Sequence, residues 1–318
     1  MSPNAQNLSV QFPLPVDHGT PACTRSPQEK FGPASLARVP QAVAPKVAKV
    51  GLRGVCLSYR TQTGERLLAL DHINLDVAAG EFLCIVGPSG CGKSTLLHLI
   101  AGLHQPTSGQ ILVDGKPVQG PGTDRILIFQ DLGLFPWLTV GENVEFGMKM
   151  KGIRKADREE KTRYYLRLVH LAQFKDSYTH QLSGGMRQRV ALARALATEP
   201  DVLLMDEPFA SLDAQTRDLL HDELERIWAE TGRTIIFVTH NVREAVRLAD
   251  RVTLLTFRPG RVKRELPVEL PRPRVMEDVG VVRAARDILD DLREEINRSL
   301  EVEFQEGVKP RVEPGAEP

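Results

Sequence analysis

Short apolar runs that end on polar residues recur through the middle of the chain. The runs span residues 82–86, 125–129, 202–205 and 234–238, and most of their side chains are apolar. Such continuous runs are typical of strands that are buried on both faces of a parallel sheet. Helical stretches lie between several of them, so the pattern predicts an open α/β sheet whose ligand lies at the carboxyl ends of the strands.

Turn residues, and a segment with more charge and a helical pattern, predict two further parts around this sheet. The turns at 114–116 and 258–261 are typical of hairpins, so we expect antiparallel strands beside the parallel core. Residues from about 131 to 197 are more charged and more helical in pattern, which indicates an inserted helical subdomain. Together these parts predict one domain over residues 46–268.

The two ends of the chain differ from this domain. Residues 1–45 contain eight of the 22 prolines and few bulky apolar side chains, so they predict a disordered arm, and residues 307–318 predict a disordered tail. In the extension at 269–306, apolar residues advance by three or four positions, which predicts one amphipathic helix that packs on its own domain or on a sister subunit. The predicted apolar face consists of Val282, Ala285, Leu289, Leu292, Ile296 and Leu300.

Composition and charge exclude several classes of protein. Hydrophobic residues make up 42%, enough for a sizeable core. The 41 basic and 41 acidic residues balance, so we expect no nucleic-acid partner bound through bulk charge. The four cysteines form neither a CxxC pair nor a metal-ligand cluster, and a disulfide scaffold is not expected. No apolar run approaches the ~18 residues of a membrane span, and the first twenty residues lack a secretory signal, so we expect a soluble cytosolic chain.

The strongest chemical motif is a phosphate-binding loop directly after the first buried run. It fits the pattern GxxxxGK[ST] in full, and its residues are Gly87, Pro88, Ser89, Gly90, Cys91, Gly92, Lys93, Ser94 and Thr95. Its glycines let backbone N–H groups turn toward phosphate oxygens at the positive end of a helix. Lys93 would place a cation on the outer phosphates, and the Ser94 hydroxyl would ligate Mg²⁺. Cys91 is not needed for this chemistry, although an accessible thiol there would make the site sensitive to modification.

An acidic pair follows the run at 202–205. Asp206 is placed to anchor Mg²⁺, and Glu207 to orient or deprotonate the attacking water. Alone, such a pair is an ordinary end of a strand. Downstream of a phosphate loop, it predicts the second half of a nucleotide site.

A third motif points to one family. Residues 182–189, LSGGMRQR, resemble the signature LSGGQ of the ATP-binding-cassette (ABC) ATPases, with Met186 in place of the more usual Gln. The resemblance extends through most of residues 50–268, and the motifs occur in the family's order. It implies the α/β fold of a P-loop NTPase, which has a RecA-like parallel sheet core, an antiparallel β subdomain and an inserted helical subdomain.

The resemblance assigns roles to residues outside the phosphate loop. Tyr59 corresponds to the aromatic residue that stacks on adenine, and Gln130 to the glutamine that senses the γ-phosphate through Mg²⁺ or the attacking water. Asp213 lies in the D-loop, and His240 corresponds to the switch histidine that holds the transition state. Asn241 stands where the family often has Asp, away from the reacting groups. The implied catalytic residues are Glu207, His240, Lys93 and Gln130, and the implied Mg²⁺ ligands are Ser94, Gln130 and Asp206.

The resemblance also implies a dimeric mechanism. ABC domains work as head-to-tail pairs that sandwich two ATP molecules, each between the phosphate loop of one subunit and the signature of the other. Ser183, Gly184 and Gly185 would bring hydroxyl and N–H donors onto the γ-phosphate of that ATP. Because one copy of each motif is present, we predict a homodimer, or a heterodimer with a second ABC subunit.

The transporter interpretation requires separate integral membrane permease subunits. In the family, the apolar stretch at 131–140 forms the groove that receives the permease, and exposed Phe135 or Trp137 would serve such an interface. The segments LSGGMRQRV, FQDLGLFPWLTV and LPRPR resemble bacterial importers of nitrate, sulfonates and taurine. This resemblance implies a periplasmic solute-binding protein as an indirect partner, and a location at the cytoplasmic face of the inner membrane.

Two alternatives share the ATPase chemistry. An ABC exporter of lipids or lipoproteins would move its cargo in the opposite direction, but the C-terminal helix and the Pro-Arg-Pro-Arg segment favour import. A soluble ABC ATPase of DNA repair, chromosome structure or translation would carry a coiled-coil or zinc insertion, a basic groove or a second cassette, and the sequence contains none of them. The cargo stays open among nitrate, sulfonate, taurine and related molecules, because the ATPase subunit never contacts it.

Overall fold

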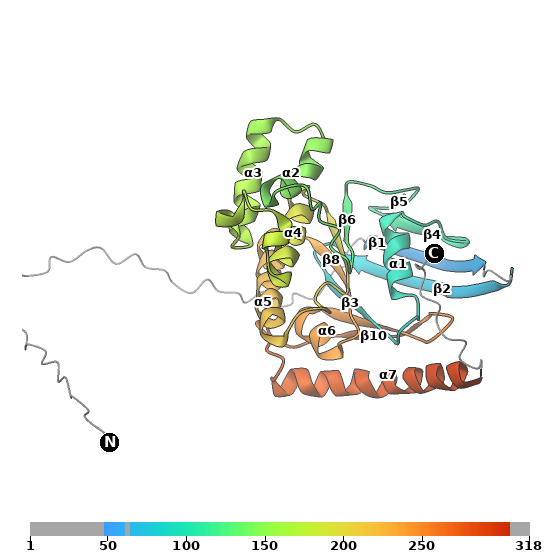
Figure 1. The fold of residues 1–318 in the computed structure, drawn as a ribbon. Coiled ribbons are helices and arrows are strands. Elements are labelled where there is room, and N and C mark those ends of the chain that lie inside the picture. Colours follow the sequence, from blue (N-terminus) through green and yellow to red (C-terminus); the bar gives the residue numbers. More distant parts are fainter. Residues whose placement is uncertain (1–47, 61–63, 306–318) are drawn as a thin grey trace, which may run out of the picture. The chain divides into compact units, whose positions relative to one another are not determined.

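Two sheets and seven α-helices make up the part of the chain that a computed structural model describes, residues 48–60 and 64–305 (Figure 1). The predicted arm at 1–45 and the predicted tail at 307–318 lie outside these residues. The strands are β1 Ala48–Arg60, β2 Arg66–Ala78, β3 Phe82–Val86, β4 Ser108–Val113, β5 Lys116–Pro117, β6 Arg125–Ile128, β7 Val202–Asp206, β8 Thr234–Val238, β9 Arg251–Leu255 and β10 Val262–Pro267. The α-helices are α1 Lys93–Ala101, α2 Val140–Met150, α3 Lys155–Leu168, α4 Gly184–Ala197, α5 Ala214–Thr231, α6 Val242–Leu248 and α7 Val279–Gln305, and short 3-10 helices lie at Ala172–Phe174 and Thr179–Gln181.

The larger sheet has the strand order β10-β9-β3-β8-β7-β6. The five strands β9, β3, β8, β7 and β6 run parallel to one another, and the edge strand β10 pairs antiparallel with β9. Every residue of β3, β7 and β8 is buried, which explains why these strands appear as uninterrupted apolar runs in the sequence. The predicted parallel core is confirmed.

Side chains alternate between the two faces of this sheet. Phe82 and Cys84 of β3 belong to a hydrophobic cluster that includes residues of α4, α5, α6 and α7. Leu83 and Ile85 belong to a second cluster, which includes residues of α1 and of the smaller sheet. The helix that follows the phosphate loop therefore packs on the face opposite to α5 and α6.

The smaller sheet is antiparallel, in the order β2-β1-β4-β5, and it confirms the predicted antiparallel part. The predicted hairpin at 114–116 joins β4 to β5, where Val113 pairs with Lys116. Cys56 lies with Asp71 and His72 in a group of metal-ligand atoms within 4.8 Å of one another, because sheet pairing joins residues that are distant in sequence.

Helices α2, α3 and α4 fall within the predicted insertion at 131–197 and contact one another. The segment that leads into them is fixed by Asn143, which is fully buried. Its side-chain amide donates to the carbonyl oxygens of Phe135, Leu138 and Thr139 at 2.9–3.2 Å. An amide that satisfies three backbone carbonyls holds the loop after β6 in one conformation. No helix within the described ranges is long and apolar enough to cross a bilayer.

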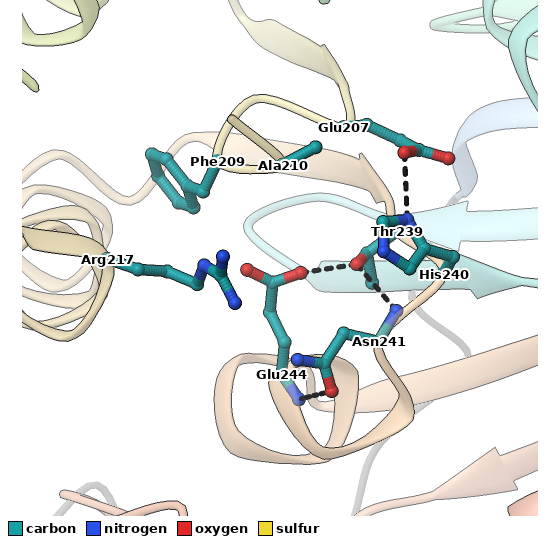
Figure 2. A pocket seen from close by; sticks show the side chains of 8 residues that line it. All are labelled: Glu207, Phe209, Ala210, Arg217, Thr239, His240, Asn241 and Glu244. Carbon is teal, nitrogen blue, oxygen red and sulfur yellow. Dashed lines mark hydrogen bonds and ion pairs between the residues drawn. The ribbon is translucent and has the colours of Figure 1, made fainter. Parts of the chain in front are cut away.

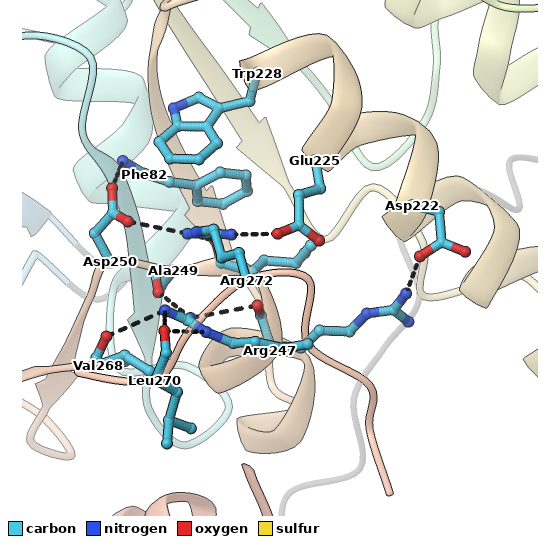
Figure 3. A network of polar contacts seen from close by, with 12 residues as sticks. Phe82, Asp222, Glu225, Trp228, Arg247, Ala249, Asp250, Val268, Leu270 and Arg272 are labelled. Carbon is cyan, nitrogen blue, oxygen red and sulfur yellow. Dashed lines mark hydrogen bonds and ion pairs between the residues drawn. The ribbon is translucent and has the colours of Figure 1, made fainter. Parts of the chain in front are cut away.

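The Pro-Arg-Pro-Arg segment anchors the passage from β10 to α7 (Figure 3). The guanidinium of Arg272 lies 4.5 Å from the ring centre of Trp228 and donates to Glu225 and Asp250 at 2.9 and 3.0 Å. Arg274 is almost completely buried and donates to several backbone carbonyls, including those of Val246 and Ala249. Burial lowers the pKa of Arg274 to about 10, so its guanidinium keeps its charge at neutral pH.

The C-terminal helix forms and packs on α6, and the predicted Ala285 and Leu292 lie on its buried face, with Leu289 half-buried. The buried residues are Val281, Ala285, Ile288, Leu292 and Glu295, whereas Val282, Ile296 and Leu300 are exposed. The prediction chose Val282 and Leu289 where the adjacent apolar residues Val281 and Ile288 are the buried ones, and the buried face also contains a carboxylate. Glu295 is 1% exposed, and its carboxylate accepts hydrogen bonds from the Phe257 backbone N–H and the Lys263 ammonium, both at 2.9 Å.

Candidate nucleotide site

The phosphate loop connects β3 to α1 and contains backbone conformations that favour glycine. Gly90 and Gly92 have φ angles of 73° and 100°, in the left-handed region. A Cβ atom on Gly92 would lie 2.7 Å from Cδ2 of Leu70, and one on Gly87 would lie 2.8 Å from Sγ of Cys91. The loop therefore combines unusual backbone angles with close packing, which explains why its motif requires glycine at these positions.

Lys93 folds back over this loop. Its Nζ donates hydrogen bonds to the carbonyl oxygens of Gly87 and Pro88, both at 2.9 Å, and the residue is 7% exposed. Nζ also lies 4.0 Å from Sγ of Cys91. A buried ammonium beside two neutral carbonyls and a thiol is suited to an anionic partner, which a phosphate oxygen would supply.

A hydroxyl and a carboxylate meet at the ends of α1 and β7. Ser94 Oγ donates to Oδ1 of Asp206 at 3.0 Å. Burial raises the pKa of Asp206, although the hydrogen bond from Ser94 opposes this shift. The two oxygens are the hard ligands that Mg²⁺ prefers, so the residues present fit that ion. Gln130 is exposed just beyond the end of β6.

Glu207 and His240 follow neighbouring strands and lie in contact (Figure 2). Oε2 of Glu207 is 2.8 Å from Nδ1 of His240. The backbone of Glu207 has a φ of 44°, a conformation that costs a non-glycine residue about 1–3 kcal/mol. A hydrogen bond from its N–H to the carbonyl oxygen of Val238, at 3.0 Å, helps to hold this conformation. Such strain often marks a functional residue, because it aims a side chain that relaxed backbone would direct elsewhere.

A buried polar network supports the strand end that carries His240. His221 is fully buried, with Nε2 2.6 Å from Oε1 of Glu244 and Nδ1 3.0 Å from the guanidinium of Arg247. Because Arg247 can only donate, Nδ1 accepts and Nε2–H donates to Glu244. The other oxygen of Glu244 accepts from the hydroxyl of Thr239, directly before His240. No sequence motif indicates this network, and its local sign is the presence of polar residues on the apolar faces of α5 and α6.

A small pocket of about 30 Å³ lies beside these residues, with room for a water molecule. Glu207 and His240 line one side of it, and Glu244 and Arg217 lie on another (Figure 2). The pocket therefore adjoins both the carboxylate predicted to act on water and the buried network behind it.

Tyr59 and the phosphate loop meet at the end of β1. The Tyr59 hydroxyl is 3.4 Å from Oγ1 of Thr95, and 39% of the residue is exposed. A ring beside the first turn of α1 is within reach of a nucleotide held by the loop. Cys91, in contrast, is fully buried, and burial raises the pKa of its thiol, so the residue is poorly suited to modification.

The signature and the D-loop residue each begin a helix. Ser183 caps α4 by accepting from the N–H of Met186 at 3.3 Å, and Asp213 caps α5 by accepting from the N–H of Thr216 at 2.9 Å. Hydrogen bonds from Thr216 lower the pKa of Asp213. A Cβ atom on Gly185 would lie 2.5 Å from Cγ2 of Thr216, so this glycine permits close packing of α4 on α5. Gly184 has more room, since the nearest atom to a Cβ there would be 3.7 Å away.

Comparisons with known proteins agree with this geometry. A model of the ABC transporter family matches residues 70–210. A nitrate import ATP-binding protein of Synechocystis sp. is 53% identical over 214 residues, which cover 67% of this chain and 80% of that protein. A taurine import ATP-binding protein of Burkholderia pseudomallei is 49% identical over 216 residues, which cover 68% of this chain and 83% of that protein.

Solved structures give the same result. A dimeric, post-hydrolysis ATP-binding cassette bound to ADP and Pi is 34% identical, with a TM-score of 0.62, and the match covers 70% of this chain and all of that one. The chain therefore belongs to the ATP-binding subunits of ABC transporters, as an ATPase of the branch that contains the nitrate and taurine import proteins.

Proposed function

We propose that this chain binds ATP and Mg²⁺ at the phosphate loop and hydrolyses the ATP to energise an importer of small anions or organic solutes. Candidate cargoes are nitrate, aliphatic sulfonates, taurine and similar molecules, as the names of the relatives suggest. The observation that carries the proposal is the convergence of Lys93, the Ser94–Asp206 pair and the Glu207–His240 pair at the carboxyl edge of one parallel sheet.

Each residue at this edge has a distinct task. The loop N–H groups and Lys93 bind the phosphates, and Tyr59 stacks on the adenine. Ser94, Gln130 and Asp206 would hold Mg²⁺, which neutralises charge on the β- and γ-phosphates when bound. Glu207 accepts a proton from the attacking water. His240, fixed by its contact with Glu207, stabilises the charge that develops on the transferred phosphoryl group.

The active unit is a pair of ABC subunits, identical or different. Ser183, Gly184, Gly185 and Asp213 complete the site of the opposite subunit in this proposal. The placement of Ser183 at the start of α4 supports it, since a helix N-terminus offers free N–H groups to an anion. The dimeric state of the related cassette with ADP and Pi is consistent with this assembly.

Ser183→Arg is expected to abolish the ATP-dependent dimer while monomeric ATP binding persists. The long, charged side chain would occupy the surface where the second nucleotide docks, at a local cost of about 1 kcal/mol for the lost helix cap. Light scattering after gel filtration with ATP, in a Glu207→Gln background that retains the nucleotide, measures the dimer. Ser108→Arg, at an exposed site on β4, should dimerise normally. A Ser183→Arg protein that still dimerises with ATP would contradict the proposed assembly.

Exposed aromatic side chains after β6 support the proposed contact with a membrane permease. Trp137 is 70% exposed, and its ring centre lies 5.5 Å from that of Phe135. Phe146 of α2 is partly exposed, 4.5 Å from the same Phe135 ring. Rigid aromatic groups that remain in solvent are typical anchors of protein interfaces. Docking of permease subunits here would place the chain at the cytoplasmic face of the inner membrane.

Affinity purification of the chain from detergent-solubilised membranes tests this part of the proposal. We expect a polytopic permease in stoichiometric yield, and at least about 10-fold less of it with Trp137→Asp, because loss of a central aromatic anchor commonly costs 2 kcal/mol or more. Leu219→Asp is the matched control, since Leu219 is 69% exposed on α5. Equal permease recovery with Trp137→Asp would contradict the docking site, and recovery of only soluble partners would contradict the transporter function.

A further inference from the structure

A β-bulge between β1 and β2 brings three metal-ligand side chains together away from the nucleotide site. Between Val55 and Leu57 the pairing register shifts, so that Cys56 on β1 faces two residues of β2, Asp71 and His72. The backbone of His72 has a φ of 48°, in the left-handed region. This irregular backbone turns a thiol, a carboxylate and an imidazole toward one another.

Two of the three distances among the ligand atoms match tetrahedral coordination closely. Sγ of Cys56 is 3.6 Å from Nδ1 of His72 and 3.8 Å from Oδ1 of Asp71. Metal–ligand bonds of about 2.3 Å to sulfur and about 2.1 Å to nitrogen or oxygen give separations of about 3.6 Å at tetrahedral angles. Nδ1 and Oδ1 are 2.5 Å apart and would need to separate by nearly 1 Å. A small rotation of the imidazole provides this, since 78% of the His72 side chain is exposed.

Neighbouring groups hold the ligands in the orientations that a metal requires. Arg261 of the turn before β10 donates to Oδ2 of Asp71, which leaves Oδ1 directed at the cluster. The backbone N–H of His72 donates to Sγ of Cys56 at 3.2 Å, a contact that fixes the position of the sulfur. Supporting hydrogen bonds of this kind commonly orient the ligands of metal sites in proteins.

We propose that Cys56, Asp71 and His72 bind one divalent ion of the zinc class. The thiolate and the imidazole favour Zn²⁺ over Mg²⁺ and Ca²⁺, which prefer oxygen ligands alone. An open hollow of about 450 Å³ lies beside Asp71 and His72, so the fourth coordination position is accessible to water or to a small anion. The site is therefore separate in chemistry and in position from the proposed Mg²⁺ site at Ser94 and Asp206.

Bound zinc would tie β1 to β2 beside a turn that adjoins the phosphate loop. The N–H of Asp71 donates to the carbonyl oxygen of Gly260, and the N–H of Gly260 donates to Ala69, both at 2.9 Å. A Cβ atom on Gly260 would lie only 2.2 Å from the carbonyl oxygen of Cys91. The turn at 258–261 thus bridges the metal ligands and the loop, and ion binding would restrain β1, β2 and this turn.

Titration of the reduced full-length chain with Co²⁺, followed by Zn²⁺, tests the site. Co²⁺ should produce a thiolate-to-metal absorption band, and Zn²⁺ should bleach it at one ion per chain, whereas excess Mg²⁺ should not. Cys56→Ser should remove the band, and His72→Gln should weaken Zn²⁺ binding at least about 10-fold, as the loss of even a supporting residue commonly does. ATP binding by the same variants reports whether they are folded.

Matched substitutions elsewhere separate this site from other thiols and imidazoles. Cys23→Ser and His104→Gln should leave the band and the Zn²⁺ affinity unchanged. An unchanged band in Cys56→Ser would overturn the proposal, as would unchanged Zn²⁺ affinity in His72→Gln. Since His72 is exposed, its substitution should leave the fold intact even if the loss of Cys56 perturbs the sheet. Failure of the wild-type chain to bind Zn²⁺ would also overturn it.

Discussion

Glu207→Gln is expected to bind ATP normally but to hydrolyse it at least about 100-fold more slowly than the wild type, as is typical when a general base is lost. The amide has nearly the same shape as the carboxylate and can keep a contact with Nδ1 of His240, which lies 2.8 Å from Oε2 in the wild type. It cannot accept a proton from water. The substitution should therefore spare the site's geometry and remove one chemical step.

Two measurements on the same protein distinguish this outcome from general damage. ATP affinity, measured by equilibrium binding, should stay within a few-fold of wild type, and phosphate release under saturating ATP should fall. Glu277→Gln, at an exposed position before α7, is the matched control and should turn over normally. Turnover near wild type for Glu207→Gln would remove this residue from the catalytic role.

Lys93→Ala should weaken ATP binding itself, by about 10-fold or more. A hydrogen bond that involves a charged group contributes about 1.5–3 kcal/mol, and Lys93 would form such bonds with the outer phosphates. Its ammonium now bonds to the carbonyl oxygens of Gly87 and Pro88 and lies 4.0 Å from Sγ of Cys91. Binding of a fluorescent ATP analogue measures the loss, and the ATP-dependent dimer should disappear at the same nucleotide concentration.

A second comparison tests whether the effect belongs to the phosphates. AMP lacks the outer phosphates, so its weaker binding should change much less in Lys93→Ala than the binding of ATP. Lys116→Ala, at an exposed lysine of β5, should bind ATP as the wild type does. Unchanged ATP affinity in Lys93→Ala would contradict the role assigned to this side chain.

Local patterns are enough to predict the nucleotide-binding core. The strands β3, β7 and β8 are largely apolar because both of their faces are buried, so they stand out in the sequence. The phosphate loop is equally visible, since its left-handed backbone at Gly90 and Gly92 admits few other residues. A site that is made of a few adjacent residues can therefore be recognised from the sequence alone.

Other features depend on segments that meet only in the folded chain. The face of α7 was partly misplaced because apolar residues occupy adjacent positions at 281–282 and 288–289, and spacing does not show which of them is buried. The burial of Glu295 was missed because it depends on the contacts with Phe257 and Lys263. The network around His221 also depends on distant segments, since His221 lies on α5 and its partners Glu244 and Arg247 lie on α6. A buried polar residue is stable only beside a distant partner, and sequence spacing alone does not identify that partner.

The amino-acid sequence by itself therefore determines the parallel core, the phosphate loop and the acidic pair at the end of β7. Each of them depends on the burial or the backbone conformation of consecutive residues. Tertiary structure decides which side of α7 is buried and how Glu207 meets His240. It also brings the ligand atoms of Cys56, Asp71 and His72 within 4.8 Å of one another. Strand pairing, register and a single bulge control these juxtapositions, and all three are set by packing between segments that are far apart along the chain.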